Sequence, residues 1–375
     1  MQYGFFVPLG SSSAQVRLAN SDKIPSADSV DQQILYAIHN ANFAEADRLI
    51  GTRLKEFYDH PKYFFLKSSM LYHARYFSDN GVSRDSLKQL LAEYCQQTIV
   101  SCEKLPETAE NKFYLGSAYG YLSRVHVMNQ SLTDAYFAAK KANRYLEEVI
   151  DENPYYYDAY LVPGVAEYFV ATRANWWQSG LAFVSGFSSN KNNAIDNLRL
   201  VQEKGIFNKD EATFILSRIY QFLEPNPDHA RYYTQLYHES FPGNRFMATE
   251  FNSIRLTDII TARGVPYFSE HADSLTALYS ITNAGTLNAI GYRLINEKKP
   301  EEALLIFQAN LKLFPEIANC YDSLAECYMT LGKKDEAIQY YSQAYEKTLT
   351  DKSIGDQFRK TLQDGIQEKL KELRK

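Results

Sequence analysis

The sequence has little of what catalytic, metal-binding or membrane-spanning proteins usually require. Only four of its 375 residues are cysteine and two are tryptophan, and the net charge is −5. The cysteines show no CxxC spacing, and no histidine stands at ligand spacing from them, which argues against a zinc site. No run of about 18 apolar residues is present, so we predict no transmembrane helix. A mildly acidic chain also lacks the basic patch that nucleic-acid binding requires.

The motifs of the common enzyme classes are missing as well. The sequence contains no GxSxG, GxGxxG, GxxxxGK or HExxH. Its seven histidines are scattered, and His238, which stands beside Glu239, has no evident partner that would make it a general base. We therefore predict a protein that is not an enzyme, with no catalytic residues, no metal and no cofactor.

The cysteines form two pairs, Cys95 with Cys102 and Cys320 with Cys327, each separated by seven residues. On a helix this spacing places the two Cα atoms about 10 Å apart along the axis. A disulfide cannot bridge that distance within one helix. We interpret all four as small, buried helix residues.

A pattern that repeats after 34 residues is the strongest positive signal in the chain. Large residues match large ones and small residues match small ones in the two copies. The first copy comprises Leu287, Ile290, Gly291, Leu294, Ala303, Phe307 and Pro315, and the second comprises Tyr321, Leu324, Ala325, Tyr328, Ala337, Tyr341 and Leu349. This period indicates a helix–turn–helix unit that buries its apolar face by stacking on its neighbours.

Small residues at these positions have a physical purpose. Two antiparallel helices approach closely only where small side chains face each other, as we expect at Gly291, Ala303 and Ala337. Lys298 and Gly332 fall in the turns between the two helices of each copy, where a left-handed residue is needed. The pattern thus predicts both the close helix crossings and the turns.

Residues 284–351 resemble two tetratricopeptide repeats, a family of helical-hairpin scaffolds. Asn310, in place of the alanine found at Ala344, and Leu349, in place of the proline found at Pro315, depart from regularity. The resemblance implies an all-α fold, a right-handed superhelical α-solenoid of stacked helical hairpins. It also implies a concave groove, lined by the first helix of each pair, that holds peptides or partner proteins.

The same pattern predicts the organisation of the whole chain. Residues 1–25 form a disordered segment or the remnant of a signal peptide, and residues 26–283 form a degenerate array of helical hairpins. An aromatic insertion at 173–189 interrupts that array. The two clear repeats follow at 284–351, and a charged helix at 352–375 caps them because a terminal repeat must present a polar face to water.

Seven residues are expected to face the groove, by their correspondence with the groove positions of the family. They are Asn288, Tyr292, Ile295, Asn319, Asp322, Glu326 and Met329. Asp322 and Glu326 would repel an anionic C-terminal peptide. An equally good interpretation of these two acids is a solvated pair of neighbours on one helix face.

Both tryptophans lie in the insertion, so it forms a second candidate interaction site. It contains Trp176, Trp177, Phe183 and Phe187. Three interpretations stay open: the insertion plugs the inner face of the array, it binds a partner or a second copy, or it touches a membrane interface. The first is favoured because large aromatic residues are mostly buried.

The function predicted from these features is a scaffold or adaptor that binds a protein or peptide in the groove. The alternative is a peripheral membrane-associated assembly protein that uses residues 176–187. The segment Phe5–Ala14 ends like a secretory signal but lacks the basic start and the long apolar core. We favour export to the cell envelope over a cytoplasmic location. The sequence determines neither the partner nor the oligomeric state.

Overall fold

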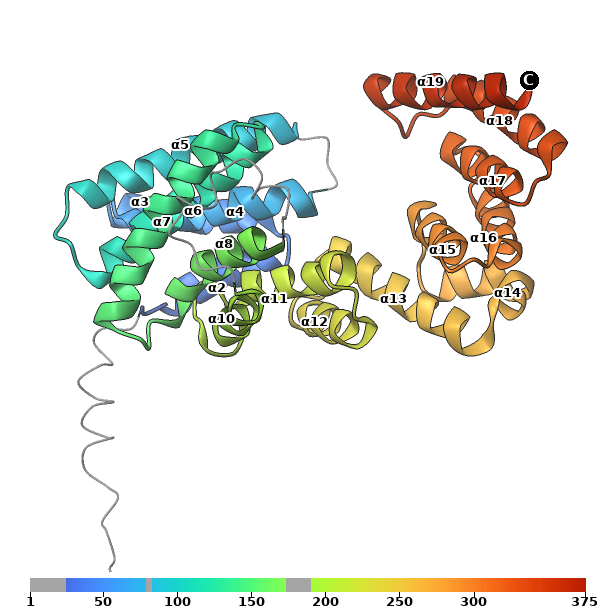
Figure 1. Ribbon diagram of the computed structural model, residues 1–375. Helices are drawn as coiled ribbons and strands as arrows, with labels where there is room; N and C mark the ends of the chain where they lie inside the picture. Colours follow the sequence, from blue (N-terminus) through green and yellow to red (C-terminus); the bar gives the residue numbers. More distant parts are fainter. Residues whose placement is uncertain (1–24, 79–82, 173–189) are drawn as a thin grey trace, which may run out of the picture. The chain divides into compact units, whose positions relative to one another are not determined.

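The computed structural model describes residues 25–78, 83–172 and 190–375 (Figure 1). Trp176, Trp177, Phe183 and Phe187 lie outside these residues. The described chain is helical, without strands, and consists of consecutive antiparallel helical pairs. The prediction of an all-α solenoid of stacked helical hairpins is confirmed.

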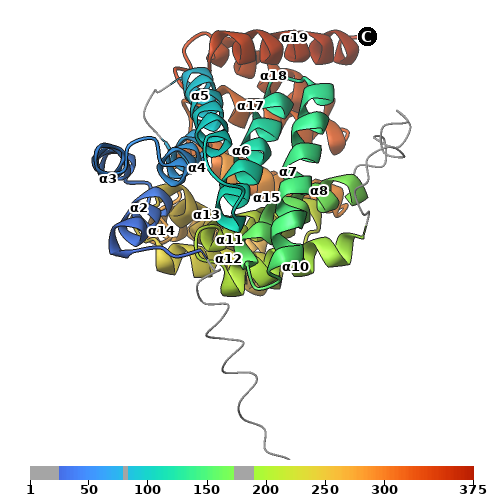
Figure 2. The same cartoon turned by 90° about the vertical axis from the view of Figure 1, so that its left-hand side faces the viewer.

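The chain divides into two compact units, Met1–Ala248 and Thr249–Lys375. In the first unit, successive helices pack against one another, and Figure 2 shows α5, α6 and α7 side by side. The helices of this unit are α2 (Ser29–His39), α3 (Phe43–Glu56), α4 (Pro61–Phe77), α5 (Arg84–Glu103), α6 (Ala109–Met128), α7 (Leu132–Glu152), α8 (Leu161–Thr172), α10 (Lys191–Lys204), α11 (Lys209–Arg218) and α12 (Pro227–Ser240). Helix α13 (Arg245–Arg263) begins in the first unit and ends in the second.

Local sequence explains where several of these helices begin. The Asp28 side chain accepts hydrogen bonds from the N–H groups of the first turn of α2, and Asp31 bonds back to the Asp28 N–H, forming a capping box. Asn226 caps α12 by accepting from the N–H of His229 at 3.1 Å, and Pro227 occupies the first helical position. Proline is favoured there because that N–H has no partner within the helix.

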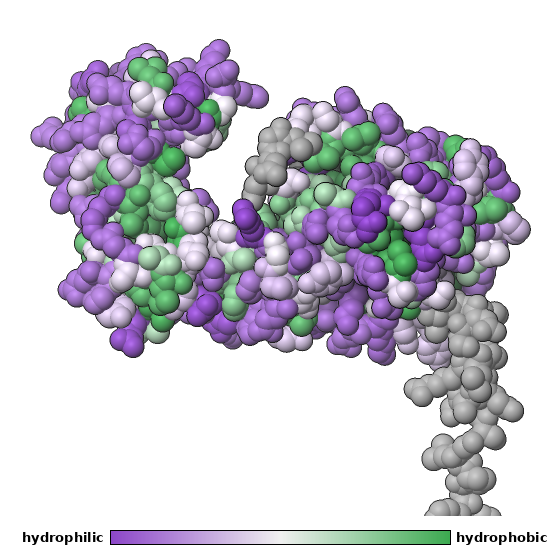
Figure 3. All heavy atoms as spheres, turned by 180° about the vertical axis from the view of Figure 1, so that it is seen from behind, coloured by the Kyte–Doolittle hydropathy of each residue, from purple (hydrophilic) through white to green (hydrophobic). Residues whose placement is uncertain are grey.

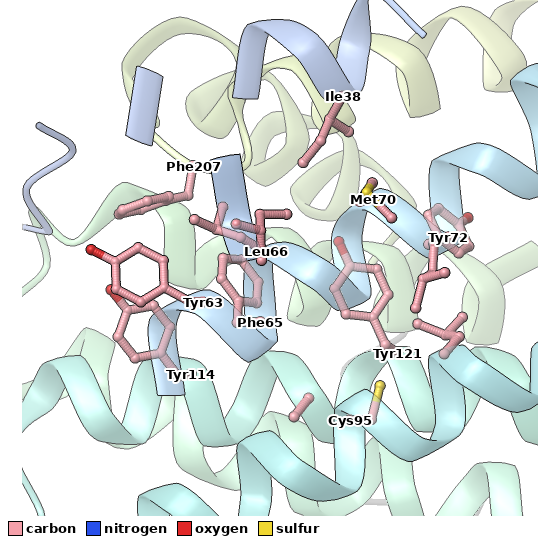
Figure 4. Packing of buried hydrophobic residues seen from close by; sticks show 14 of the residues in the cluster. Ile38, Tyr63, Phe65, Leu66, Met70, Tyr72, Cys95, Tyr114, Tyr121 and Phe207 are labelled. Atoms are coloured by element: carbon pink, nitrogen blue, oxygen red, sulfur yellow. The ribbon is translucent and has the colours of Figure 1, made fainter. Parts of the chain in front are cut away.

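Aromatic side chains form the centre of the first unit (Figure 4). The Phe65 ring from α4 lies 5.5 Å from that of Tyr114 and 6.4 Å from that of Tyr121, both on α6. It also lies 6.2 Å from Phe207, in the turn before α11. These distances are typical of favourable aromatic pairs. The unusual aromatic content of this unit therefore serves largely to join helices that are far apart in the sequence.

The first and last helical pairs of this unit meet in space. His39, at the end of α2, lies with its Nδ1 2.8 Å from the hydroxyl of Tyr237 on α12. The Asn244 side chain donates to the carbonyl of His39 at 2.8 Å, and the Gly243 N–H donates to Asn40 at 2.7 Å. About 200 residues separate these partners. An ideal solenoid has contacts only between neighbouring repeats, so this unit departs from that arrangement by closing on itself.

The second unit contains the regular repeats. Helix α15 contacts α16 and α17, α17 contacts α18, and α14 contacts α16, so the helices form two layers. Helix α19 packs against α18. The helices are α14 (Val265–Leu278), α15 (Gly285–Asn296), α16 (Pro300–Leu313), α17 (Ala318–Thr330), α18 (Lys334–Thr348) and α19 (Asp356–Leu373).

The repeat period is visible in the backbone. Lys298 and Gly332, 34 residues apart, both adopt left-handed conformations, with φ of 61° and 72°. Ala303 and Ala337 are completely buried, as the close helix crossings predicted. The structure thus confirms the two 34-residue hairpins at 284–351. The further boundaries predicted from sequence at 25, 283 and 351 stay predictions.

The two departures from the repeat pattern have different structural consequences. Asn310 is buried, and its Nδ2 donates to the carbonyl of Ala284 at 3.1 Å, which ties α16 to the start of α15. Leu349 is 66% exposed, so its place at the end of α18 makes no packing demand. The first departure adds a contact, whereas the second has no structural explanation.

The four cysteines are free and buried on α5 and α17, as predicted. Burial raises the pKa of Cys95 and of Cys320 to about 12, so these thiols stay protonated at neutral pH. No helix in the described ranges is long and apolar enough to cross a bilayer. Apolar side chains nevertheless reach the surface in each unit (Figure 3).

Gly291→Ala tests the close helix packing of the repeats. An added Cβ would lie 2.5 Å from the ring of Phe307, so we expect the free energy of unfolding to fall by about 1–3 kcal/mol. Gly365→Ala on α19 is the matched control, because no atom lies within 4 Å of its added Cβ. That control should gain about 0.5–1 kcal/mol from helix propensity. Urea unfolding followed by circular dichroism measures both, and equal effects would contradict the packing.

Candidate functional site

The seven residues predicted to face the groove lie on two helices of the second unit. Asn288, Tyr292 and Ile295 are on α15, and Asn319, Asp322, Glu326 and Met329 are on α17. Asn288 and Asp322 are 34 residues apart, as are Tyr292 and Glu326. Because α15 and α17 contact each other, equivalent positions lie on one surface. We call the surface formed by these seven residues the repeat face.

Tyr292 and Glu326 join the two repeats across this face. The Tyr292 hydroxyl donates to Oε2 of Glu326 at 2.8 Å and lies 3.2 Å from Oγ of Ser323. Burial and the neighbouring carboxylates hold the pKa of Tyr292 above its usual range, so the hydroxyl keeps its proton. Glu326 is thereby fixed in orientation, with its carboxylate half-buried at the surface.

Asp322 is the acid on this face without a bonded partner. Burial, and then the nearby charge of Glu326, raise its pKa to about 6, while Lys369 on α19 has a smaller opposing effect. Among the residues that the structure describes, no side chain forms a hydrogen bond or ion pair with its carboxylate. A half-buried carboxylate that lacks a partner is costly to ionise, and a cation placed beside it would remove that cost.

Asn288 presents a second acceptor with the same need. Its Oδ1 is buried and accepts no hydrogen bond from any described residue. A buried polar atom of this kind costs about 1–3 kcal/mol unless a donor reaches it. In position, Asn288 is the counterpart of Asp322 in the preceding repeat. The face therefore places one acceptor without a donor in each of two neighbouring repeats.

The remaining predicted residues have a more structural environment. Tyr292, Ile295 and Met329 are partly buried and pack against the core of the second unit. Asn319, in the first turn of α17, is also partly buried. The structure brings Tyr292 and Glu326 into direct contact, whereas the other predicted residues share only the surface.

Sequence analysis missed two residues of this environment. Ser323 is fully buried next to Asp322 and contacts the Tyr292 hydroxyl. Its small size just inside the face was the available signal. Lys369 acts on Asp322 from a helix that follows the repeats, and no feature of the repeat pattern indicates that approach. The aromatic insertion lies outside the described residues, so its three interpretations stay open.

The chemistry of the repeat face is that of hydrogen-bond and charge acceptance. Its polar groups are two carboxylates, two side-chain amides and one tyrosine hydroxyl that is already engaged. No group of three or more His, Cys, Asp or Glu in the described part of the chain could hold a metal ion. Such a face can accept from backbone N–H groups and from the cationic ends of lysine or arginine.

Comparisons with known proteins add little to this geometry. No family model matches the sequence, and no curated protein matches it. One similar solved structure is the crystal structure of the P58(IPK) TPR domain, which is 13% identical over 92% of this chain and 98% of that chain, with a TM-score of 0.23. A TM-score this low transfers neither a site nor a ligand. The helical-hairpin fold is instead evident from the helices of this chain itself.

Proposed function

We propose that this chain is a non-catalytic scaffold that binds a peptide, or an extended segment of a partner protein, on the repeat face. The observation that supports this most directly is the pair of acceptors, Asn288 Oδ1 and the Asp322 carboxylate, that lack donors. An extended peptide supplies a backbone N–H at regular intervals along its length. Two acceptors in successive repeats suit such a ligand better than they suit a small compact molecule.

The charge of the face selects among peptides. Asp322 and Glu326 lie one helical turn apart on α17, and a cationic side chain near both would lower the cost of ionising Asp322. We therefore expect lysine or arginine in the bound segment. An acidic segment would meet like charge and lose affinity.

Binding of such a segment should depend on pH in a defined direction. A cation favours the ionised form of Asp322, whose pKa in the free protein is about 6. Affinity for a basic peptide should therefore rise between pH 5 and pH 7 by about tenfold or less, and then level off. Fluorescence anisotropy of a labelled lysine-containing peptide across this range measures the effect. Affinity that falls with rising pH would contradict the proposed role of Asp322.

The decisive test uses an array of random nine-residue peptides, compared by net charge. We expect basic peptides to bind and the isosteric variants Asp322→Asn and Glu326→Gln each to weaken binding by about tenfold. Asp335→Asn is the matched control, because this exposed acid lies on α18, outside the repeat face. If acidic peptides bind as well as basic ones, or if all three variants bind like the wild type, the repeat face is not the site.

A further inference from the structure

The first unit contains a cavity that the repeat face does not explain. It has a volume of about 340 Å³ and lies among α4, α6, α7 and α8, with Ile215 of α11 contributing to its wall. The volume falls at the lower end of the range of small-molecule sites. Helices from three successive hairpins form its walls, so it is a built concavity and not a flat apolar patch.

Its walls are almost entirely apolar, and its mouth reaches solvent. Alanine, valine, leucine, isoleucine and aromatic side chains dominate the lining. Tyr76, Val127 and Leu132 line it with 40%, 45% and 50% of their surfaces exposed. Apolar side chains that line a cavity and also meet water lose free energy until a ligand covers them.

Arg124 is the charged residue of the lining, and its charge is already neutralised. Its guanidinium pairs with the buried carboxylate of Glu211. The same guanidinium lies 4.6 Å from the ring centroid of Tyr72 and 5.2 Å from that of Tyr121. A carboxylate or phosphate entering the cavity would therefore face a pair of zero net charge, and its own desolvation would go uncompensated.

The hydroxyl of the lining is also satisfied. Ser123 Oγ donates to the carbonyl of Ala135 at 2.9 Å, from α6 to α7. A ligand consequently gains nothing by presenting a strong acceptor to this hydroxyl. What the cavity rewards is removal of hydrocarbon from water.

We infer that this cavity binds an uncharged small molecule with a hydrocarbon body, such as an alkyl chain or an alicyclic ring. The cavity and the repeat face share no residue. This second binding activity is therefore independent of the peptide-binding function proposed above. The ligand class follows from the apolar walls, the neutral Arg124–Glu211 pair and the satisfied serine.

The test uses the full chain and the uncharged probe N-phenyl-1-naphthylamine, whose fluorescence rises in apolar surroundings. We expect saturable binding, displaced by 1-decanol at concentrations at least tenfold lower than those needed with decanoate at pH 8. The two competitors share an alkyl chain and differ in charge. Absence of probe binding, or equal displacement by decanoate, would overturn the inference.

Two variants locate the binding. Ala139→Phe on α7 and Val165→Phe on α8 fill the cavity from different walls, and each should weaken 1-decanol binding by about tenfold or more. Lys140→Phe adds the same ring to an exposed position of α7 and should leave binding unchanged. Circular dichroism confirms which variants are folded. Undiminished 1-decanol binding in a folded cavity-filled variant would place the ligand elsewhere.

Discussion

Replacing Glu211 by alanine is expected to destabilise the first unit by about 3–5 kcal/mol, because it leaves the Arg124 guanidinium buried without its counter-charge. Glu211 is 1% exposed and pairs with Arg124, and it also accepts from the Tyr121 hydroxyl at 2.6 Å. These contacts join α6 to α11 across 87 residues. Urea unfolding at pH 7, followed by circular dichroism, measures the loss.

The double variant Arg124→Met/Glu211→Leu separates charge from packing. Removing both charges leaves no unpaired ion, so we expect stability to return to within about 1–2 kcal/mol of the wild type. If the double variant is as unstable as the sum of both single variants, the pair contributes through shape alone.

The same pair predicts a dependence on pH. Burial opposes ionisation of Glu211, but the charge of Arg124 outweighs it and lowers the pKa below the usual 4.5. The stabilisation by the pair is then complete above pH 4.5 and is lost as the pH falls through the pKa of the folded state. The Glu211→Leu/Arg124→Met protein should lose less stability on acidification than the wild type.

The second large effect is expected from Asp158→Ala. Asp158 is 1% exposed, and its Oδ1 accepts the N–H groups of Ile206, Phe207 and Asn208 at 3.0, 2.9 and 2.7 Å. Alanine would leave these three donors buried without an acceptor. At about 1 kcal/mol or more for each donor, the free energy of unfolding should fall by about 3 kcal/mol or more.

Asp158→Asn is the matched control, since its amide oxygen can occupy the place of Oδ1. Burial raises the pKa of Asp158 to about 6 although the backbone N–H groups oppose this. For a carboxyl whose pKa is raised on folding, stability declines as the pH rises from about 4 to about 6. The asparagine variant should therefore lose far less stability than the alanine variant at pH 7 and should lack this decline. Equal losses in both variants would refute the hydrogen-bonding role.

The regular part of the fold was predictable because its determinants are local. Gly291 faces the ring of Phe307, and Lys298 and Gly332 occupy equivalent left-handed turns. Each of these features follows from residues within one 34-residue period. The same period was sufficient to place Asn288 and Asp322 on one surface.

The chemical state of the candidate site was not predictable in the same way. Whether Asn288 Oδ1 has a donor, and whether Asp322 has a cation, depends on side chains arriving from other helices. Lys369, which approaches Asp322, belongs to a helix outside the repeats. A repeat pattern specifies which way a residue faces, and it does not specify what that residue meets.

The sequence by itself determined that this chain is helical, that its helices pair, and where its two regular hairpins begin and turn. Only the tertiary structure decided that the first helical pair of the first unit meets the last one at His39 and Tyr237, and that Glu211 neutralises Arg124 beside a cavity. The physical reason is that helix periodicity and turn chemistry act over a few residues. Contacts across 87 or 198 residues arise from small rotations between successive hairpins, which accumulate along the array and leave no local signal in the sequence.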